Sequence, residues 1–350
     1  MTLTELSYYI RKYAPYALIF FLLLLIIFYL LKILMIYFNL NKPQTTYINP
    51  IFSKIERPLI PEATVSADFK FILDNIEGQP ITATQAAKVY WLPQEKPKFG
   101  YREKLFLLAK TLGFDTDNVS YKLNNSEATF DDGRQKLIVD IGNFNFRYEL
   151  KPENYSEYFA EPMIPDVKEA EKKATDFLIA TTRYPEELSR GKVNPVFWFY
   201  NKEVGQSIVL DNNNLSNANM IEIDYYRPDI GDYPAVSPKY YNSQNYVLMV
   251  FYKEGYKILR AQVKFFEKSE EQVGVYPLIS GDRAYQILQN NQALIILSPP
   301  DEKNIIIKKM FLGYFDPDVY QKYLQPVYVF LGDNNFVAYV PAVSEEYLLP

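Results

Sequence analysis

YAPYALIFFLLLLIIFYLL, residues 13–31, is an unbroken apolar stretch without a charged side chain, and it decides the first element of the fold. At about 1.5 Å of rise per residue, its roughly 19 residues span about 28 Å as a helix, close to the hydrocarbon thickness of a bilayer. No water in that layer can satisfy exposed backbone amides, so one α-helix is expected. The apolar sequence continues past Lys32 to Phe38. We therefore predict a membrane-spanning helix over residues 13–38 and not the buried helix of a soluble protein, which needs no such length.

The segment before this helix, residues 1–12, is short and polar and ends with Arg11 and Lys12. A cleaved signal peptide would have an apolar core of about 7–15 residues that ends in a small-residue cleavage site. The apolar stretch here is longer and no such site follows it, so a cleaved signal peptide is not expected. Arg11 and Lys12 favour a cytoplasmic N-terminus, whereas Lys32 and Lys42 weaken that bias. Since most of the chain follows the helix, we predict a single-pass protein of the cell membrane with the N-terminus cytoplasmic and the later domains extracytoplasmic.

The composition excludes several classes of function. Residues 1–40 hold three of the 37 basic and one of the 42 acidic residues, so the remainder carries a net charge of −7 and is not expected to bind nucleic acid. The sequence has no cysteine and no histidine, which excludes disulfides, Ser-His-Asp and Cys-His catalytic systems and His/Cys zinc sites. It also lacks the glycine patterns of Walker, Rossmann and kinase sites, so no nucleotide or other cofactor is expected.

The segment after the helix, residues 39–63, contains Pro43, Pro50, Pro58 and Pro61. Proline restricts itself and its preceding residue to extended backbone, which favours a semi-rigid stalk. Apolar residues lie between the prolines, so an irregular segment packed on the first folded domain is the alternative.

The remaining sequence predicts α+β units in which a helix packs on an antiparallel sheet, repeated along the chain. Predicted strands outnumber predicted helices and follow one another without crossover helices, which favours antiparallel sheets covered on one face by a helix. The expected divisions are a cytoplasmic N-terminus at 1–12, the membrane helix at 13–38, the stalk at 39–63, and α+β units at 64–160, 161–270 and 271–350.

In the first unit, apolar alternation over 65–73 predicts a strand, and helical spacing predicts a helix over 103–111. Thr82 or Thr84 is expected to cap a short helix that ends at Val89. Further strands, separated by Asp-Gly and Gly-Asn turn signals, are expected at 119–123, 128–130, 137–141 and 144–150.

The second and third units also begin with helices. Asp166 is placed to cap a helix that ends near residue 180, and Ser280 or Asp282 to cap a helix carrying Ala284 and Leu288. Strands are expected at 196–200, 221–226, 246–252 and 256–266 in the second unit, and at 305–315, 326–331 and 336–343 in the third, where residues 332–335 close the last hairpin.

The third unit contains GDRAYQILQNN at 281–291, IIIKKMFLGYFDPD at 305–318 and YLQPVYVFLGDNNFVAYVPAV at 323–343. This order of an alanine-containing helix, a strand ending in LGYF and a closing hairpin resembles the C-terminal part of the YycH/YycI regulators. The unit also resembles PepSY-type domains more broadly. The resemblance covers mainly residues 240–350, and the chain departs from it in having Tyr328 near a position where those regulators usually have tryptophan.

This resemblance implies a single-pass membrane protein whose extracytoplasmic domain modulates a cell-wall sensor kinase. It implies no catalytic residues, because none exists in that family to carry over. We therefore expect a membrane-anchored, non-catalytic interaction or regulatory protein with a protein partner in the membrane or envelope.

The densest charged motif is DYYRPDIGD at 224–232. Because tyrosine and arginine are enriched at the energetic centres of protein interfaces, we predict a partner-binding site there. Its candidate residues are Asp224, Tyr225, Tyr226, Arg227, Asp229 and Asp232. Two alternatives remain: a tethered envelope hydrolase that uses carboxylates of this run, spaced as in glycosidases, and a structural subunit of an envelope or secretion assembly.

Two other acidic motifs predict no chemistry. Asp131, Asp132 and Gly133 have the sequence of a hairpin turn. The segment 211–216 resembles a weak calcium loop but lacks the acidic spacing and closing glutamate of an EF-hand. No metal site and no catalytic residue is therefore expected.

Overall fold

The computed structural model describes residues 3–40, 47–63, 69–76, 78–81, 84–164, 166–210, 215–299 and 303–349. The chain divides into two compact units, Met1–Tyr47 and Ile48–Pro350. We call the second unit the body.

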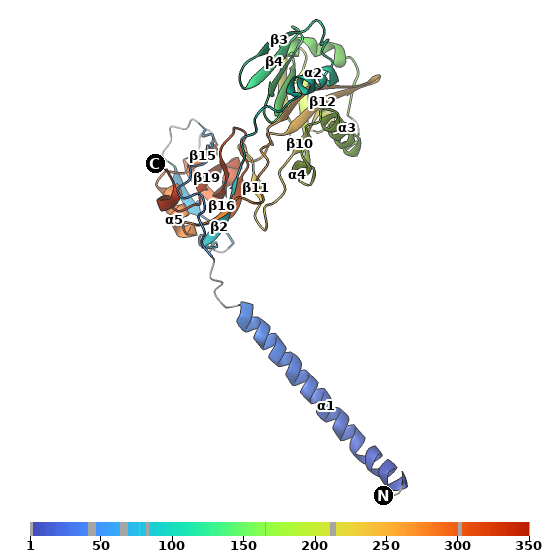
Figure 1. Ribbon diagram of the computed structural model, residues 1–350, viewed down its shortest axis with the longest axis vertical. Coiled ribbons are helices and arrows are strands. Elements are labelled where there is room, and N and C mark those ends of the chain that lie inside the picture. The colour runs from blue at the N-terminus through green and yellow to red at the C-terminus, as the bar shows by residue number, and fades with distance from the viewer. Residues whose placement is uncertain are drawn as a thin grey trace. The chain divides into compact units, whose positions relative to one another are not determined.

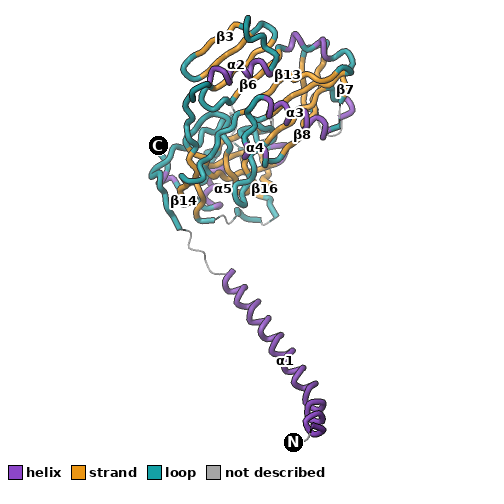
Figure 2. Tube along the Cα trace, turned by 45° about the vertical axis from the view of Figure 1, so that its right-hand side comes forward, coloured by secondary structure: helices purple, strands orange, loops and turns teal. Residues whose placement is uncertain are grey.

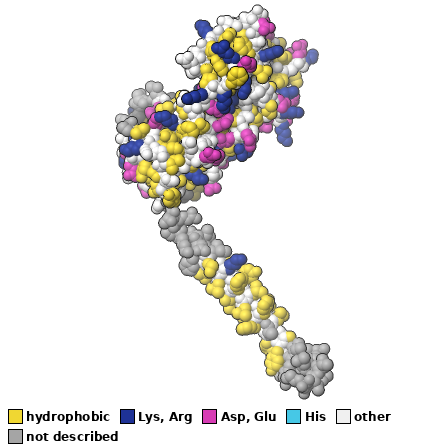
Figure 3. All heavy atoms as spheres, in the orientation of Figure 1, with side chains coloured by type: hydrophobic (Ala, Val, Ile, Leu, Met, Phe, Trp, Pro, Cys, Tyr) yellow, Lys and Arg dark blue, Asp and Glu magenta, His cyan; other side chains and the backbone are white. Residues whose placement is uncertain are grey.

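The first unit is the helix α1, which runs from Leu3 to Leu40 and contains the helix expected over residues 13–38 (Figure 1). Among the described residues, α1 is the one helix long and apolar enough to cross a membrane: Leu18–Met35 has a mean hydropathy of 3.0 and no buried side chain. Figure 3 shows these apolar side chains along its surface. An uncovered apolar surface of this length is unfavourable in water, so α1 has the properties of a membrane span or a signal sequence.

The body contains a large sheet in which the neighbouring strands follow the order β3-β4-β5-β6-β13-β12-β10-β8-β9, with β7 paired to β12 (Figure 2). All pairs in this sheet are antiparallel. Its strands are β3 Ser120–Leu123, β4 Glu127–Asp131, β5 Gln135–Asp140, β6 Phe146–Leu150, β7 Pro162–Met163, β8 Val193–Asn201, β9 Gln206–Val209, β10 Met220–Tyr225, β12 Tyr246–Tyr252 and β13 Gly255–Val263.

Both faces of the large sheet carry apolar clusters. On one face, α2 (Tyr101–Thr111) and α3 (Val167–Ala180) supply buried side chains such as Leu105, Leu108 and Phe177. As expected, the side chain of Asp166 caps α3 by accepting from the Lys168 amide. The short helix α4, Glu186–Ser189, adds Leu188 to the same core. The opposite face packs Phe159 and other aromatic side chains on the sheet.

A second sheet is built on the long strand β16, and we call it the β16 sheet. Its order is β1-β16-β18-β19-β15, and β11 also pairs with β16. The helix α5, Gly281–Gln289, covers one face and is capped by Ser280, as expected. Its strands are β1 Lys70–Leu73, β11 Ala235–Val236, β15 Leu294–Leu297, β16 Asn304–Phe315, β18 Pro326–Gly332 and β19 Val337–Pro341.

A small sheet, β14-β2-β17, corrects one sequence prediction. The short helix expected to end at Val89 is wrong, because β2, Ala86–Trp91, is a strand between β14, Val273–Pro277, and β17, Tyr323–Leu324. Pairing with two strands distant in sequence overrides the local helical tendency. Thr82 lies outside the described residues, as does Val65 of the first expected strand.

The short 3-10 helices connect or cover these strands. They are η1 Pro152–Asn154, η2 Ser156–Tyr158, η3 Leu215–Asn217, η4 Asp333–Asn335 and η5 Glu345–Tyr347. The hairpin expected to close at residues 332–335 is confirmed by η4, which joins β18 to β19.

The α+β class with antiparallel sheets is confirmed, with β1 and β11 as parallel exceptions on β16. Strands from the expected units 64–160 and 161–270 share the large sheet, and β1 from the first range joins strands of 271–350. No break in strand pairing therefore marks these boundaries. The division into repeated helix-on-sheet units stays a prediction.

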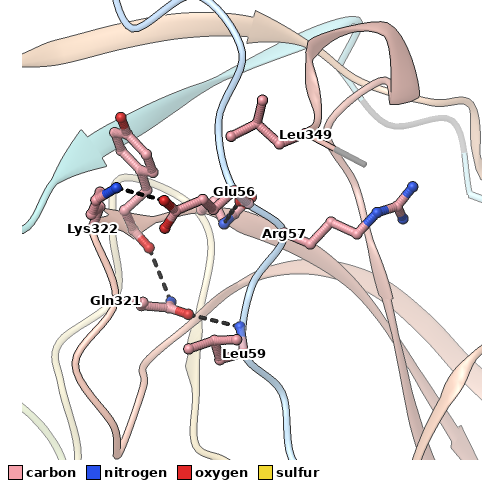
Figure 4. A pocket seen from close by; sticks show the side chains of 8 residues that line it. Glu56, Arg57, Leu59, Gln321, Lys322 and Leu349 are labelled. Atoms are coloured by element: carbon pink, nitrogen blue, oxygen red, sulfur yellow. Dashed lines mark hydrogen bonds and ion pairs between the residues drawn. The ribbon is translucent and has the colours of Figure 1, made fainter.

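Residues 48–63, which we call the strap, belong to the body and are not a free stalk. Ile55 is fully buried, and Asn49 and Ile55 form bridges with Val275 and Leu348. Figure 4 shows the side chains of Glu56, Arg57 and Leu59, near the middle of the strap, beside a hollow of about 280 Å³. There Glu56 pairs with Lys322 at 2.5 Å, and the Gln321 side chain accepts from the Leu59 amide at 2.9 Å. The alternative expectation, an irregular segment packed on a folded domain, describes these residues. Their contacts, however, are with the C-terminal part of the body and not with the first folded domain. Residues 41–46 lie outside the described residues.

We expect Ile55→Ala to lower the free energy of unfolding of the body by about 2–5 kcal/mol, because it leaves a cavity in a closed core. Ile48→Ala is the matched control, since Ile48 lies in the same strap but is 47% exposed, and it should change stability by no more than about 0.5 kcal/mol. Urea unfolding of the full-length chain in detergent, followed by fluorescence of Trp91 and Trp198, measures both. Equal, small effects would show that the strap is not packed.

Candidate functional site

The run 224–232 does not lie on one surface. Asp224 and Tyr225 end β10 and are fully buried, and Arg227 is 3% exposed. Tyr226 is half-buried, and Asp229 and Asp232 are exposed. The run therefore leaves the large sheet, crosses the interior and reaches the surface within nine residues.

Arg227 is the most densely paired residue of the run. Its Nε donates to Asp316 Oδ1 at 2.7 Å, its Nη2 donates to the Phe266 carbonyl at 2.6 Å, and its Nη1 forms an ion pair with Glu187 at 2.9 Å. The guanidinium also lies 4.0 Å from the centre of the Phe265 ring. Burial lowers the pKa of Arg227, but Asp316 and Glu187 outweigh it and keep that pKa above its ordinary value, so the side chain stays charged.

The partners of Arg227 come from different parts of the body. Asp316 directly follows β16, Glu187 lies in α4, and Phe266 follows β13 of the large sheet. Asp316 also accepts from the Gln244 side chain at 2.7 Å. A single guanidinium therefore joins the end of β10 to the end of β16. This arrangement fixes the large sheet and the β16 sheet relative to each other.

Asp224 holds a neighbouring loop in place. Its Oδ2 accepts from the Ser243 amide at 2.9 Å and from the Tyr226 hydroxyl at 3.2 Å. The Ser243 hydroxyl in turn donates to the Tyr225 carbonyl at 2.5 Å. These bonds anchor one end of the loop 237–243, whose Ser237 carbonyl accepts from the Tyr339 hydroxyl of the β16 sheet at 2.8 Å.

A second buried acid, Glu222, lies two residues before Asp224 on the same face of β10. Burial raises the pKa of Glu222 to about 8, with a further contribution from Asp224, and burial raises the pKa of Asp224 to about 7. Sequence reasoning missed Glu222, because polar residues at alternating strand positions usually mark a solvated face. The two carboxyls are seen to be buried only in the tertiary structure, where other residues cover this face of β10.

The remaining acids lie in other surroundings. Asp229 pairs with Lys192 at 3.6 Å on the surface, whereas Asp232 lines a groove. The carboxylates that a hydrolase would need are thus divided between the interior, a surface ion pair and a groove. Among the described residues, no group of three or more acids is arranged to hold a metal ion; residues 211–214 of the calcium-like loop lie outside this description.

The groove is the feature of this region that a partner can reach. It has a volume of about 460 Å³ and lies beside β16. Its lining includes Asp232, Tyr233, Pro234, Tyr240, Lys309 and Phe311. Asp232 comes from the predicted run, Tyr240 from the loop that Asp224 anchors, and Lys309 and Phe311 from the strand whose end Arg227 holds. The buried residues of the run thus support the groove, and we name it the β16 groove.

Comparison with known proteins gives similarity of structure only. No protein-family model matches the chain, and no match is found among curated proteins. A crystal structure of an uncharacterised protein from Eubacterium rectale is similar at 12% identity and a TM-score of 0.38, covering 81% of this chain and 90% of that one.

Two further structures are similar to the chain. YycH from Bacillus subtilis has 13% identity and a TM-score of 0.35, covering 73% of this chain and 53% of that one. The YpeB C-terminal domain from Bacillus megaterium has 12% identity and a TM-score of 0.29, covering 72% and 95%. YycH, one of the structures similar to this chain, is also named in the resemblance described above for residues 240–350.

We expect Arg227→Met to destabilise the body by about 3–5 kcal/mol, because it leaves Asp316 buried without its counter-charge. The double variant with Asp316→Asn should lose less than the sum of the single variants, which urea unfolding in a double-mutant cycle measures. Arg190→Met is the control, since that side chain is 67% exposed and 3.8 Å from Glu186. An additive double variant would contradict the coupling.

The buried acid Glu222 predicts a pH dependence of stability. Its pKa is about 8 in the folded state against an ordinary value of 4.5, so the folded chain holds this proton over a range in which the unfolded chain releases it. Its contribution to the free energy of unfolding is therefore full below about pH 4.5 and is lost as the pH rises to about 8.

Glu222→Gln should remove this loss and make the body more stable than the wild type at pH 8, by an amount of the order of 2 kcal/mol, with less difference at pH 5. Glu127→Gln, an exposed substitution on β4, is the control. Urea unfolding at both pH values measures the effect. Parallel pH profiles for the wild type and Glu222→Gln would contradict it.

Proposed function

We propose that the chain is a single-pass membrane protein whose extracytoplasmic body regulates a protein partner by direct contact, without catalytic turnover. The observation that carries this proposal is the β16 groove, an aromatic and accessible recess on a body that is joined in sequence to an uncovered apolar helix. The resemblance of residues 240–350 to membrane-anchored regulators supports the same role.

The lining of the groove suits recognition. Tyr233, Tyr240 and Phe311 provide apolar area at low cost in side-chain entropy, and Lys309 and Asp232 provide charges of both signs. Of the predicted residues, Asp232 is the one we assign to direct contact. Asp224, Tyr225 and Arg227 support the groove from the interior. Tyr226 donates to Asp224 and to the Tyr241 carbonyl, and Asp229 pairs with Lys192 on the surface.

The absence of cysteine from the sequence allows a direct test, because one introduced thiol is unique. We expect Asp232→Cys, treated in intact source cells with a membrane-impermeant thiol-reactive photocrosslinker, to form a covalent adduct with another protein. Lys122→Cys on the edge strand β3 is the control: it is exposed and should react with the reagent, which reports an extracytoplasmic body, but should give no such adduct.

The outcomes separate the parts of the proposal. If neither cysteine reacts until the cells are opened, the orientation is wrong. If both react and Asp232→Cys repeatedly gives no protein adduct, contact through this groove is not the function. A hydrolytic activity lost on Asp232→Asn in a folded variant would instead favour the enzyme alternative.

A further inference from the structure

The edge of β16 is shared by two short strands that leave a gap between them. β1 pairs with the start of β16, ending at Leu73 opposite Ile307, and β11 pairs with its end, beginning at Ala235 opposite Tyr314. Between these pairs, residues 308–313 have β18 on one side and no strand of the described chain on the other. At about 3.3 Å per residue this stretch is about 20 Å long. Asp74 and Pro234, which are hydrogen-bonded to Ile307 and Tyr314, lie beside its two ends and leave room for a strand of about four or five residues.

Backbone groups are directed into this gap. The Tyr314 amide donates to the Pro234 carbonyl at 2.8 Å, so Tyr314 turns its backbone groups toward β11. Because these directions alternate along a strand, Leu312 and Met310 turn theirs to the same side. The register shift of β16 lies between Ile307 and Lys309, and the pairing with β18 is continuous from Lys309 to Tyr314, so the alternation that includes Met310, Leu312 and Tyr314 is not interrupted. The open edge therefore offers the N–H and C=O groups of two residues.

The β16 groove lies along this open edge. Its lining includes Leu312, Phe311 and Lys309 of β16, and Pro234, which directly precedes β11 and has no amide to donate. Tyr240 packs with the cluster on one face of the β16 sheet, and Tyr233 with the cluster on the other. The walls thus come from both faces of the sheet, as a slot for one additional strand requires.

Charge indicates what kind of strand fits. Lys308 is paired with Asp74 at 2.6 Å, whereas Lys309 is exposed and its ammonium lies 5.1 Å from the centre of the Phe311 ring. Among the described residues, no acid forms an ion pair with Lys309. An acidic side chain on an added strand would supply that counter-charge, and apolar neighbours would pack on Tyr240 and Phe311.

We infer that a partner protein binds by adding an extended segment to β16 in the gap between β1 and β11, with an acidic residue beside Lys309 and apolar residues against the aromatic walls. Main-chain hydrogen bonds to Met310 and Leu312 would give affinity, and the side-chain contacts would give specificity. This inference rests on the proposed function and specifies the segment of the partner.

The test uses the full-length chain in lipid nanodiscs and pools of acetylated pentapeptides that alternate Val, Ile, Phe or Tyr with Ser or Thr. One pool has a central Glu, a second has Lys there, and a third is the Glu pool with alternate backbone nitrogens methylated. Hydrogen exchange of the amides of Met310 and Leu312 is the readout. We expect the Glu pool to slow this exchange at least tenfold and the other two pools to leave it unchanged.

Lys309→Glu should reverse the preference in favour of the Lys pool, while Lys136→Glu, an exposed charge reversal on the large sheet, should not. The inference is overturned if no pool slows the hydrogen exchange, if all three pools slow it equally, or if Lys309→Glu keeps the wild-type preference. The inference is also overturned if hydrogen exchange slows without any peptide as the protein concentration rises. In that case a second copy of the chain occupies the open edge of β16. If Lys309→Glu keeps the covalent adduct at Asp232→Cys, the strand-addition mode fails while the proposed function stands.

Discussion

The buried charge of Arg227 is the constraint on which the body depends. A guanidinium removed from water is costly unless its charge is compensated; here Asp316 and a backbone carbonyl accept hydrogen bonds from it, and Glu187 forms an ion pair with it. These partners lie at the end of β16, in α4 and after β13, so the requirement to satisfy one cation fixes the two main sheets together. A hydrophobic contact could not specify this geometry, because it has no direction.

Buried polar contacts also explain why the run 224–232 is divided between the interior and the surface. Asp224 anchors the loop 237–243 through the Ser243 amide, Arg227 anchors the end of β16, and Asp232 reaches the groove. Residues that resemble an interface in sequence thus divide into an internal support and an exposed end.

β16 is the strand that connects the parts of the body. It pairs in parallel with β1 and β11, which come from distant parts of the sequence, and it is antiparallel to β18. Two short strands in line cannot cover one long strand, and the stretch between them keeps its backbone edge open. In most proteins such an edge is protected against association, whereas this one lies beside a recess lined by aromatic residues.

The sequence by itself determined the elements whose signals are local. The apolar run Leu18–Met35 requires a helix, Asp166 caps α3, and residues 332–335 close the last hairpin. Tertiary structure decided what depends on distant partners: β2 is a strand because β14 and β17 pair with it, and Arg227 is interior because Asp316 lies opposite. Local propensity acts over a few residues, whereas burial and strand pairing are set by segments far away in the chain, so the groove could not be read from its residues.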